Sequence, residues 1–124
     1  MYGPAIAAKF AELLLSHLTI AAELVKALKA GNSAAAEDAR KRWFMNADDI
    51  AKFLGQINPY WSEAEWRNML HEHLRLLSNE VATRIAGNYE ENVATSDLVQ
   101  TQALEMADVL TRGIAQQFPM VFAV

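Results

Sequence analysis

The chain has 124 residues, of which 52% are hydrophobic, so it is long enough to bury a core in a single domain that spans residues 1–124. It contains no cysteine, which excludes disulfides and thiolate metal sites and fits a reducing compartment, so we expect a cytoplasmic protein. The net charge of −4 provides no basic surface, and we therefore expect no nucleic-acid partner.

Helix-forming residues run through almost the whole chain, and strand patterns are nearly absent. Pro4 suits the first turn of a helix, Gly31, Gly55 and Gly87 suit helix ends, and Pro119 stops the last helix. The predicted helices cover residues 5–30, 34–55, 63–86 and 88–117. Helices of similar length with short connections pack antiparallel. The sequence therefore predicts an all-α fold, an up-down-up-down antiparallel four-helix bundle.

Capping residues refine the ends of these helices. Asn32 offers a side-chain oxygen to the start of the second helix, and Ser62 with Glu65 forms a capping box at the start of the third. We also expect a break within the third helix near Ser78 and Asn79.

The most apolar N-terminal run is LLLSHLTIAA, which lies between Glu12 and Glu23 and contains His17. This run is too short and too polar to span a bilayer, and no charged segment of a signal peptide precedes it. We therefore expect no membrane partner.

Polar residues interrupt the apolar stripe of each predicted helix. At about 100° per residue, His17, Asn46 and His73 fall inside the stripes, and Asp49 lies at the edge of one. Counting along the first two helices from their connecting turn places His17 opposite Asn46 and Asp49. His73 lies one turn from the same level. We therefore expect a buried polar layer near the middle of the bundle.

The last helix contributes an acid to this layer. Asp97 lies in its apolar stripe, and Asp108 lies close to that stripe. Each aspartate is within about two turns of the level of the other polar residues. The sequence does not decide between them.

Two interpretations of the layer remain open. In the first, its residues hydrogen-bond one another as a core network, since buried polar groups need partners. In the second, the imidazoles of His17 and His73 bind a divalent metal, zinc, iron or manganese. Asp49 and either Asp97 or Asp108 then supply oxygen ligands, in the way that bundle metal sites are assembled from facing helices.

Trp43 and Asn46 are the residues that we expect to contact a small-molecule ligand, whose identity stays open. In a metal site, Asn46 orients a carboxylate ligand. Trp43 belongs to an aromatic set with Tyr60, Trp61 and Trp66, which is also typical of a packed bundle end. No serine, histidine and acid are placed as a catalytic triad, so the sequence favours a non-catalytic binding or structural role.

Three stretches carry a family resemblance: HLTIAAELVKALKAGN, WFMNADDIAKFLGQINPYWSEAEWRNMLHEHLRL and TQALEMADVLTRGIAQQFP. They resemble a group of small all-helical bacterial proteins of unknown function, common in Gram-positive spore-formers. The block from Trp43 to Trp61 is the most distinctive part. The resemblance implies a helical bundle and no activity. Longer members of this group carry a further N-terminal helical segment with its own histidine and tryptophan, which we expect this chain to lack.

Members of this group have sometimes been labelled acetylglutamate kinase, and the present sequence does not support that activity. It has no glycine-rich loop to hold phosphates and no alternation of strands and helices for a nucleotide fold. We therefore expect no nucleotide binding and no kinase activity.

Apolar residues near the C-terminus and on the first helix predict self-association. The tail PMVFAV, residues 119–124, leaves Met120, Val121 and Phe122 to be covered, and a missing N-terminal segment exposes a groove. We therefore expect a homodimer in which the tail or the first helix contributes to the interface.

Overall fold

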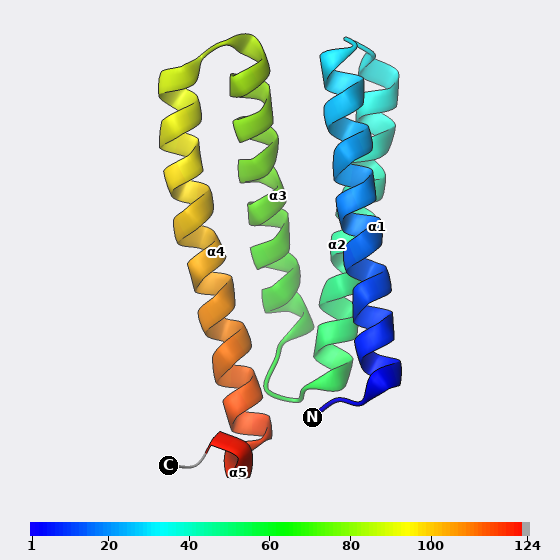
Figure 1. Ribbon diagram of the computed structural model, residues 1–124, viewed down its shortest axis with the longest axis vertical. Coiled ribbons are helices and arrows are strands. Elements are labelled where there is room, and N and C mark those ends of the chain that lie inside the picture. The colour runs from blue at the N-terminus through cyan, green and yellow to red at the C-terminus, as the bar shows by residue number, and fades with distance from the viewer. Residues whose placement is uncertain (123–124) are drawn as a thin grey trace.

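The computed structural model describes residues 1–122 and confirms the all-α four-helix bundle (Figure 1). Four long helices run alternately up and down, and a one-turn helix follows them. Their bounds are α1 (Pro4–Lys29), α2 (Ser33–Ile57), α3 (Glu63–Ala86), α4 (Tyr89–Gln117) and α5 (Pro119–Phe122). Helices α1 and α2 form one hairpin, and α3 and α4 form the other.

Most of the capping signals act as the sequence predicts. Pro4 begins α1, and Gly31 and Gly87 take positive φ angles of 69° and 76° just after α1 and α3. The side chains of Asn32 and Ser62 each accept a hydrogen bond from the backbone amide three residues later, at 3.1 and 3.2 Å. Local sequence therefore determines where most of these helices begin and end.

The prediction that Gly55 ends the second helix is wrong, because α2 continues to Ile57. Gly55 has no positive φ angle. A Cβ atom added at this glycine would lie 3.1 Å from the Cβ atom of Glu63, at the start of α3. Its function is therefore to let two helix ends approach each other.

The predicted break near Ser78 and Asn79 is also wrong, because α3 is continuous through both residues. The Asn79 side chain donates to Thr95 Oγ1 of α4 at 2.7 Å, so it does not compete with its own helix. The sequence did not predict the short helix α5, which places Met120, Val121 and Phe122 in exposed positions. The rest of the tail, residues 123–124, lies outside the described residues.

The core lies between α1, α2 and α3. Apart from Trp61 in the turn before α3, its buried apolar residues belong to these helices: Leu13, Leu24, Ala27, Ala36, Ala39, Trp43, Ala47, Ile50, Ala51, Leu54, Trp66, Leu70, Leu74 and Leu76. Within residues 1–122, the buried residues of α4 are Thr95, Gln102 and Gly113, and none of them has a large apolar side chain. Helix α4 therefore lies at the margin of the core.

The two hairpins meet mainly through α2 and α3. No Cα atom of α1 comes within 8 Å of a Cα atom of α4, so backbone packing does not close the fourth side of the bundle. Helices of a bundle normally pack with their axes 8–10 Å apart, so a closed bundle would bring these backbones together. This opening positions the candidate site.

Helix α1 is unusual for its exposed apolar surface. Leu15 and Leu18 are 67% and 66% exposed. Among the described helices, α1 alone is long and apolar enough to cross a membrane by length and composition, although signal sequences and core helices meet the same criterion. The expectation that this region is too short and too polar to span a membrane considered a run of ten residues. Helix α1, which contains that run, has 26 residues.

Candidate functional site

His17 projects from α1 into the middle of the bundle and contacts Asn46, as the sequence predicts. His17 Nδ1 lies 2.8 Å from Asn46 Oδ1, and Asn46 Nδ2 donates to the carbonyl oxygen of Leu13 at 3.2 Å. The imidazole also stacks on the indole of Trp43, with 5.5 Å between ring centroids. Trp43 is buried, so it supports the His17 ring.

The Asn46 amide determines the tautomer of His17. Its NH2 group is occupied by the Leu13 carbonyl, so its oxygen faces the imidazole. An amide oxygen only accepts hydrogen bonds, and therefore His17 Nδ1 carries the proton. In the neutral ring, Nε2 then has a free lone pair.

His73, on α3, is held in the same way. Its Nδ1 atom lies 2.9 Å from Gln102 Oε1, and Gln102 Nε2 donates to the carbonyl oxygen of Met69 at 2.8 Å. In the neutral tautomer, the His73 Nδ1 atom therefore carries the proton and Nε2 has the lone pair. Neither Nε2 atom forms a hydrogen bond within residues 1–122.

Burial keeps His17 neutral. Desolvation lowers the pKa of the imidazole below its usual value, and the hydrogen bond with Asn46 opposes this effect. The neighbouring His73 lowers the pKa further, because two cationic rings would repel each other. At neutral pH, His17 therefore presents a lone pair and not a proton at Nε2.

Both imidazoles line one hollow of about 260 Å³ between the hairpins. All four long helices contribute to its walls, and apart from the two histidines those walls are apolar: Phe10, Leu14, Ile50, Leu54, Trp66, Leu70, Met106, Ala107 and Leu110. The indole nitrogen of Trp66 is buried without a hydrogen-bond partner in the described part of the chain. The hollow therefore combines apolar walls with two imidazole Nε2 atoms that form no hydrogen bond within residues 1–122.

A second hollow of about 260 Å³ continues from the first toward the chain termini. The two hollows share Phe10, Leu54 and Leu110 as wall residues. The second hollow is lined mainly by apolar side chains of α1 and α4, together with Met1, Tyr2 and Trp61. The space between α1 and α4 is therefore a continuous apolar groove, which we call the α1–α4 groove.

The aspartates of the predicted polar layer do not join the histidines. Asp49, Asp97 and Asp108 are exposed. Asp49 lines a separate hollow between α1 and α2, together with Lys9 and Lys52. Within residues 1–122, no group of three or more histidine, aspartate or glutamate side chains is placed to hold a metal ion.

Two polar contacts of this region were missed from the sequence. Gln102, and not Asp97 or Asp108, is the α4 residue that reaches the histidine layer. Asp48, the neighbour of Asp49, lies 2.7 Å from His71 Nε2 on the outer side of α2 and α3. A helix turns by about 100° per residue, so adjacent aspartates face different neighbours.

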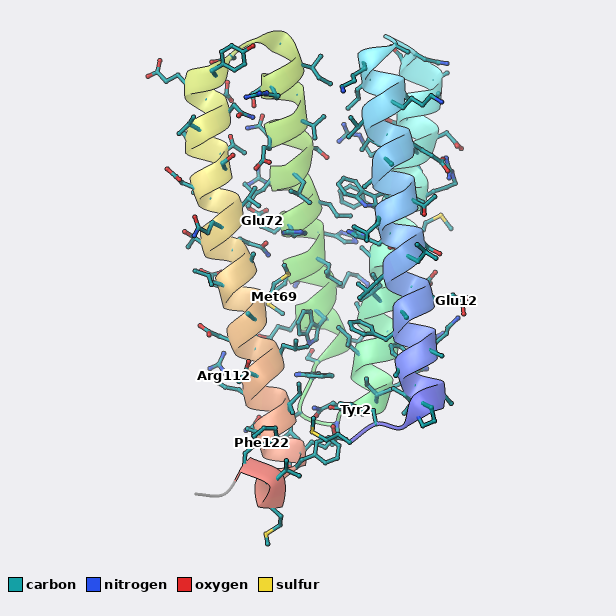
Figure 2. All side chains as sticks on the ribbon, viewed as in Figure 1. Tyr2, Glu12, Met69, Glu72, Arg112 and Phe122 are labelled. Carbon is teal, nitrogen blue, oxygen red and sulfur yellow. The ribbon has the colours of Figure 1, made fainter. Side chains whose placement is uncertain are left out.

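Polar and aromatic contacts close the end of the bundle near the chain termini, where Tyr2 lies (Figure 2). Asn58 is fully buried; its amide donates to the Gly113 carbonyl oxygen at 2.9 Å and to Tyr2 Oη at 3.2 Å. Its oxygen accepts from the Tyr60 amide at 2.8 Å. Trp61 packs so closely against Gly113 that an added Cβ atom would overlap its indole ring.

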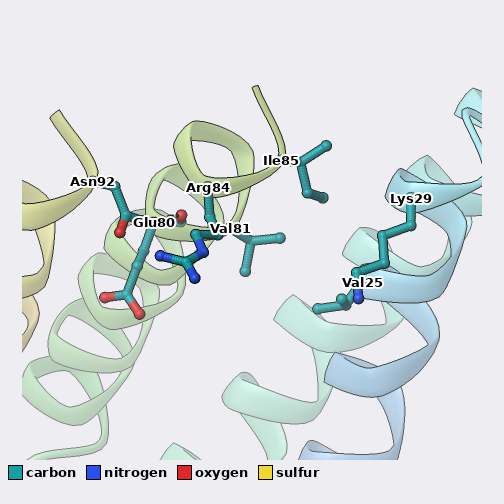
Figure 3. Close-up of a pocket in the computed structure, with 7 residues that line it drawn as sticks. All are labelled: Val25, Lys29, Glu80, Val81, Arg84, Ile85 and Asn92. Carbon is teal, nitrogen blue, oxygen red and sulfur yellow. Dashed lines mark hydrogen bonds between the residues drawn. The ribbon is translucent and has the colours of Figure 1, made fainter. Parts of the chain in front are cut away.

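A further hollow of about 390 Å³ lies at the opposite end of the bundle (Figure 3). Val25 and Lys29 of α1 face Val81 and Arg84 of α3 across it. Its cationic side chains are exposed, and Arg84 lies over the ring of Tyr89, 5.3 Å from the ring centroid. The hollow is also lined by half-buried Asn92, whose amide donates to the Glu80 carbonyl oxygen at 2.7 Å.

The chain was compared with protein-family models, curated proteins and solved structures, and none of them matches it. The fold and the geometry of the groove therefore carry the functional argument. They define the class of protein, a four-helix bundle that is open along one side.

Proposed function

We propose that this protein is a non-catalytic binding protein that takes an apolar ligand in the α1–α4 groove. The observation that carries this proposal is the open side of the bundle, where α1 and α4 face each other without backbone contact. Apolar side chains of all four long helices line that space. Apolar surface of this extent on a bundle is typical of a binding site.

The dimensions of the groove support a small-molecule ligand. Each of its two hollows has about 260 Å³, and they share three wall residues. Ligand pockets commonly occupy roughly 300–1,000 Å³ and combine apolar walls with a few fixed polar groups. His17 and His73 are such groups.

Filling the groove tests the proposal. Ala107 is an exposed residue that lines the first hollow, so Ala107→Trp should occupy the space without replacing a core side chain. We expect this variant to weaken binding of an apolar fluorescent probe by about tenfold, the loss of about 1.4 kcal/mol of contact. The measurement is a fluorescence titration of the purified protein.

Ala94→Trp is the matched control, because Ala94 is an exposed alanine of α4 that does not line either hollow of the groove. It adds the same side chain to the same helix. Equal probe affinity of the two variants would contradict binding in the groove.

A second candidate function is metal binding, with zinc, iron or manganese as the expected ions. The specific observation in its favour is that both His17 and His73 are fixed with the proton on Nδ1, which leaves Nε2 free to coordinate. Metal-binding histidines commonly donate their other ring nitrogen to an oxygen acceptor in this way.

A further inference from the structure

The α1–α4 groove is long and narrow. Its two hollows of about 260 Å³ each follow one another along the helices and share Phe10, Leu54 and Leu110 as wall residues. On α1, the wall residues run from Ile6 to His17, which is roughly 16 Å along the helix at about 1.5 Å per residue. Each hollow alone is small, so a groove of this form suits a linear chain better than a bulky ring system.

Polar side chains lie at one end of this groove only. Within residues 1–122, the surface of the second hollow is formed by apolar atoms alone. In the first hollow, the polar side chains are His17 and His73, and they are the wall residues of α1 and α3 farthest from the second hollow. A ligand that matches this distribution has one polar end and an apolar tail.

The hydrogen bonds behind the imidazoles determine what the polar end of the ligand must be. Because His17 Nδ1 donates to Asn46, the Nε2 atom of the neutral ring can only accept, and the same holds for His73 beside Gln102. Desolvation lowers the pKa of His17, so its Nε2 atom stays an acceptor at neutral pH. A hydroxyl group donates to such an atom. A carboxylate only accepts, and it would lose hydration against the apolar walls.

We propose that the α1–α4 groove binds a linear aliphatic alcohol whose hydroxyl donates to Nε2 of His17 and whose alkyl tail extends past Phe10 into the second hollow. With staggered carbon–carbon bonds of about 1.5 Å, roughly ten to twelve carbon atoms cover the length of the groove. This inference rests on the proposed function, because it names the ligand class of the same groove.

Competition with an apolar fluorescent probe tests the ligand class. The competitors are 1-decanol, decanoate and 1-adamantanemethanol, a compact alcohol of similar carbon number, at pH 8, which is above the ordinary imidazole pKa of about 6.5. We expect 1-decanol to bind about tenfold more tightly than either of the others. Equal affinity for decanoate would overturn the role of the hydroxyl. Equal affinity for 1-adamantanemethanol would overturn the linear chain.

A substitution at His17 tests the polar end. His17→Phe keeps an aromatic ring beside Trp43 and removes the acceptor, so the preference for 1-decanol over decanoate should fall about tenfold while the probe still binds. His71→Phe is the matched control, because His71 lies on the outer side of the bundle beside Asp48, and it should keep the wild-type preference.

Circular dichroism shows whether His17→Phe is folded, and His17→Gln replaces it if it is not. The glutamine amide can donate to a carboxylate, so this variant should also lose the preference for the alcohol. A wild-type preference in the folded variant would overturn the assignment of the hydroxyl to His17.

A substitution in the second hollow tests the position of the tail. Ala7 is exposed and lines that hollow, so Ala7→Trp should weaken binding of 1-decanol about tenfold and leave 1-hexanol unchanged, because the shorter chain ends in the first hollow. Ala5→Trp is the control, because Ala5 is exposed on the same helix and lines neither hollow. Unchanged affinity of the Ala7→Trp variant for 1-decanol would overturn the position of the tail.

The results also separate this inference from the proposed function. Probe binding that depends on Ala107, without competition by 1-decanol, would contradict the alcohol and leave the apolar groove as a binding site. Probe binding that does not depend on Ala107 would contradict both.

Discussion

Two buried polar regions of this bundle differ in how completely their atoms are used. At the closed end, Asn58 has a partner for both amide hydrogens and for its oxygen. At the middle of the bundle, half-buried His17 and His73 each use one ring nitrogen, and the other forms no hydrogen bond within residues 1–122. A fully satisfied polar network specifies a structure, whereas fixed and unused donors or acceptors are typical of a binding site. We therefore interpret Asn58 as a structural residue and the two histidines as ligand-binding residues.

The largest effect on folding is expected at the closed end. Asn58→Ala removes three hydrogen bonds at a fully buried position, and it leaves the Gly113 carbonyl and the Tyr2 hydroxyl without this partner. We expect the free energy of unfolding to fall by about 3 kcal/mol. Urea denaturation followed by circular dichroism measures the change.

Asn68→Ala is the control for this substitution, because Asn68 is an exposed asparagine of α3. Its effect should stay within about 0.5 kcal/mol. A loss of less than about 1 kcal/mol for Asn58→Ala would show that the closed end is not a structural network.

A smaller, pH-dependent effect is expected at His17. Because burial lowers its pKa in the folded protein below the value of 6.5, the unfolded chain binds the proton more readily. The free energy of unfolding should therefore fall as the pH drops below 6.5, and this loss should level off below the pKa of the folded state. Electrostatic repulsion from His73 also lowers the pKa of His17 and adds to the effect.

His17→Gln should remove this contribution and flatten the dependence of stability on pH. Urea denaturation above and below pH 6.5 gives the slope of the free energy of unfolding against pH for the variant and for the wild type. Ser16→Ala, at the neighbouring exposed position, should keep the wild-type slope. Equal slopes for His17→Gln and the wild type would contradict the burial of a neutral imidazole.

Substitutions on the outer face of α1 are expected to have the smallest effect on the folding of a single chain. We propose that the protein is a homodimer through the exposed stripe of Ala11, Leu15, Leu18 and Ala22, whose spacing of four, three and four residues suits pairing of two helices. Leu18→Glu should halve the mass seen by light scattering and change the free energy of unfolding of the monomer little, because Leu18 is exposed.

Leu98→Glu is the control for assembly, because Leu98 is an exposed leucine of α4, 56% exposed. It should leave the mass of the assembly unchanged. A wild-type protein that remains monomeric at high concentration would contradict the homodimer.

The comparison also shows what the sequence could predict. The contact of His17 with Asn46 followed from counting residues along a hairpin with a short turn, which determines the relative height of α1 and α2. The helix ends at Gly31 and Gly87 followed from local capping chemistry. These features depend on neighbours in the sequence or on one tight turn.

Other features depend on the rotation and spacing of whole helices, which the sequence pattern does not determine. Asp49 lies at the edge of an apolar stripe, and a modest rotation of α2 decides whether it faces the core or the solvent. Gln102 reaches His73 because of how α4 lies against α3, and the pattern favoured Asp97 or Asp108. The opening between α1 and α4 is a property of the packing of two hairpins.

The marginal position of α4 has a consequence for the motions of the molecule. Its buried residues within the described chain are a threonine, a glutamine and a glycine, and its apolar contribution to the core comes from partly buried side chains such as Leu110 and Ile114. Local opening of a helix requires the least free energy where few apolar contacts hold it. We therefore expect the backbone amides of α4 to exchange with solvent deuterium before those of α2, and access to His73 to involve α4 swinging outward while α1, α2 and α3 stay folded.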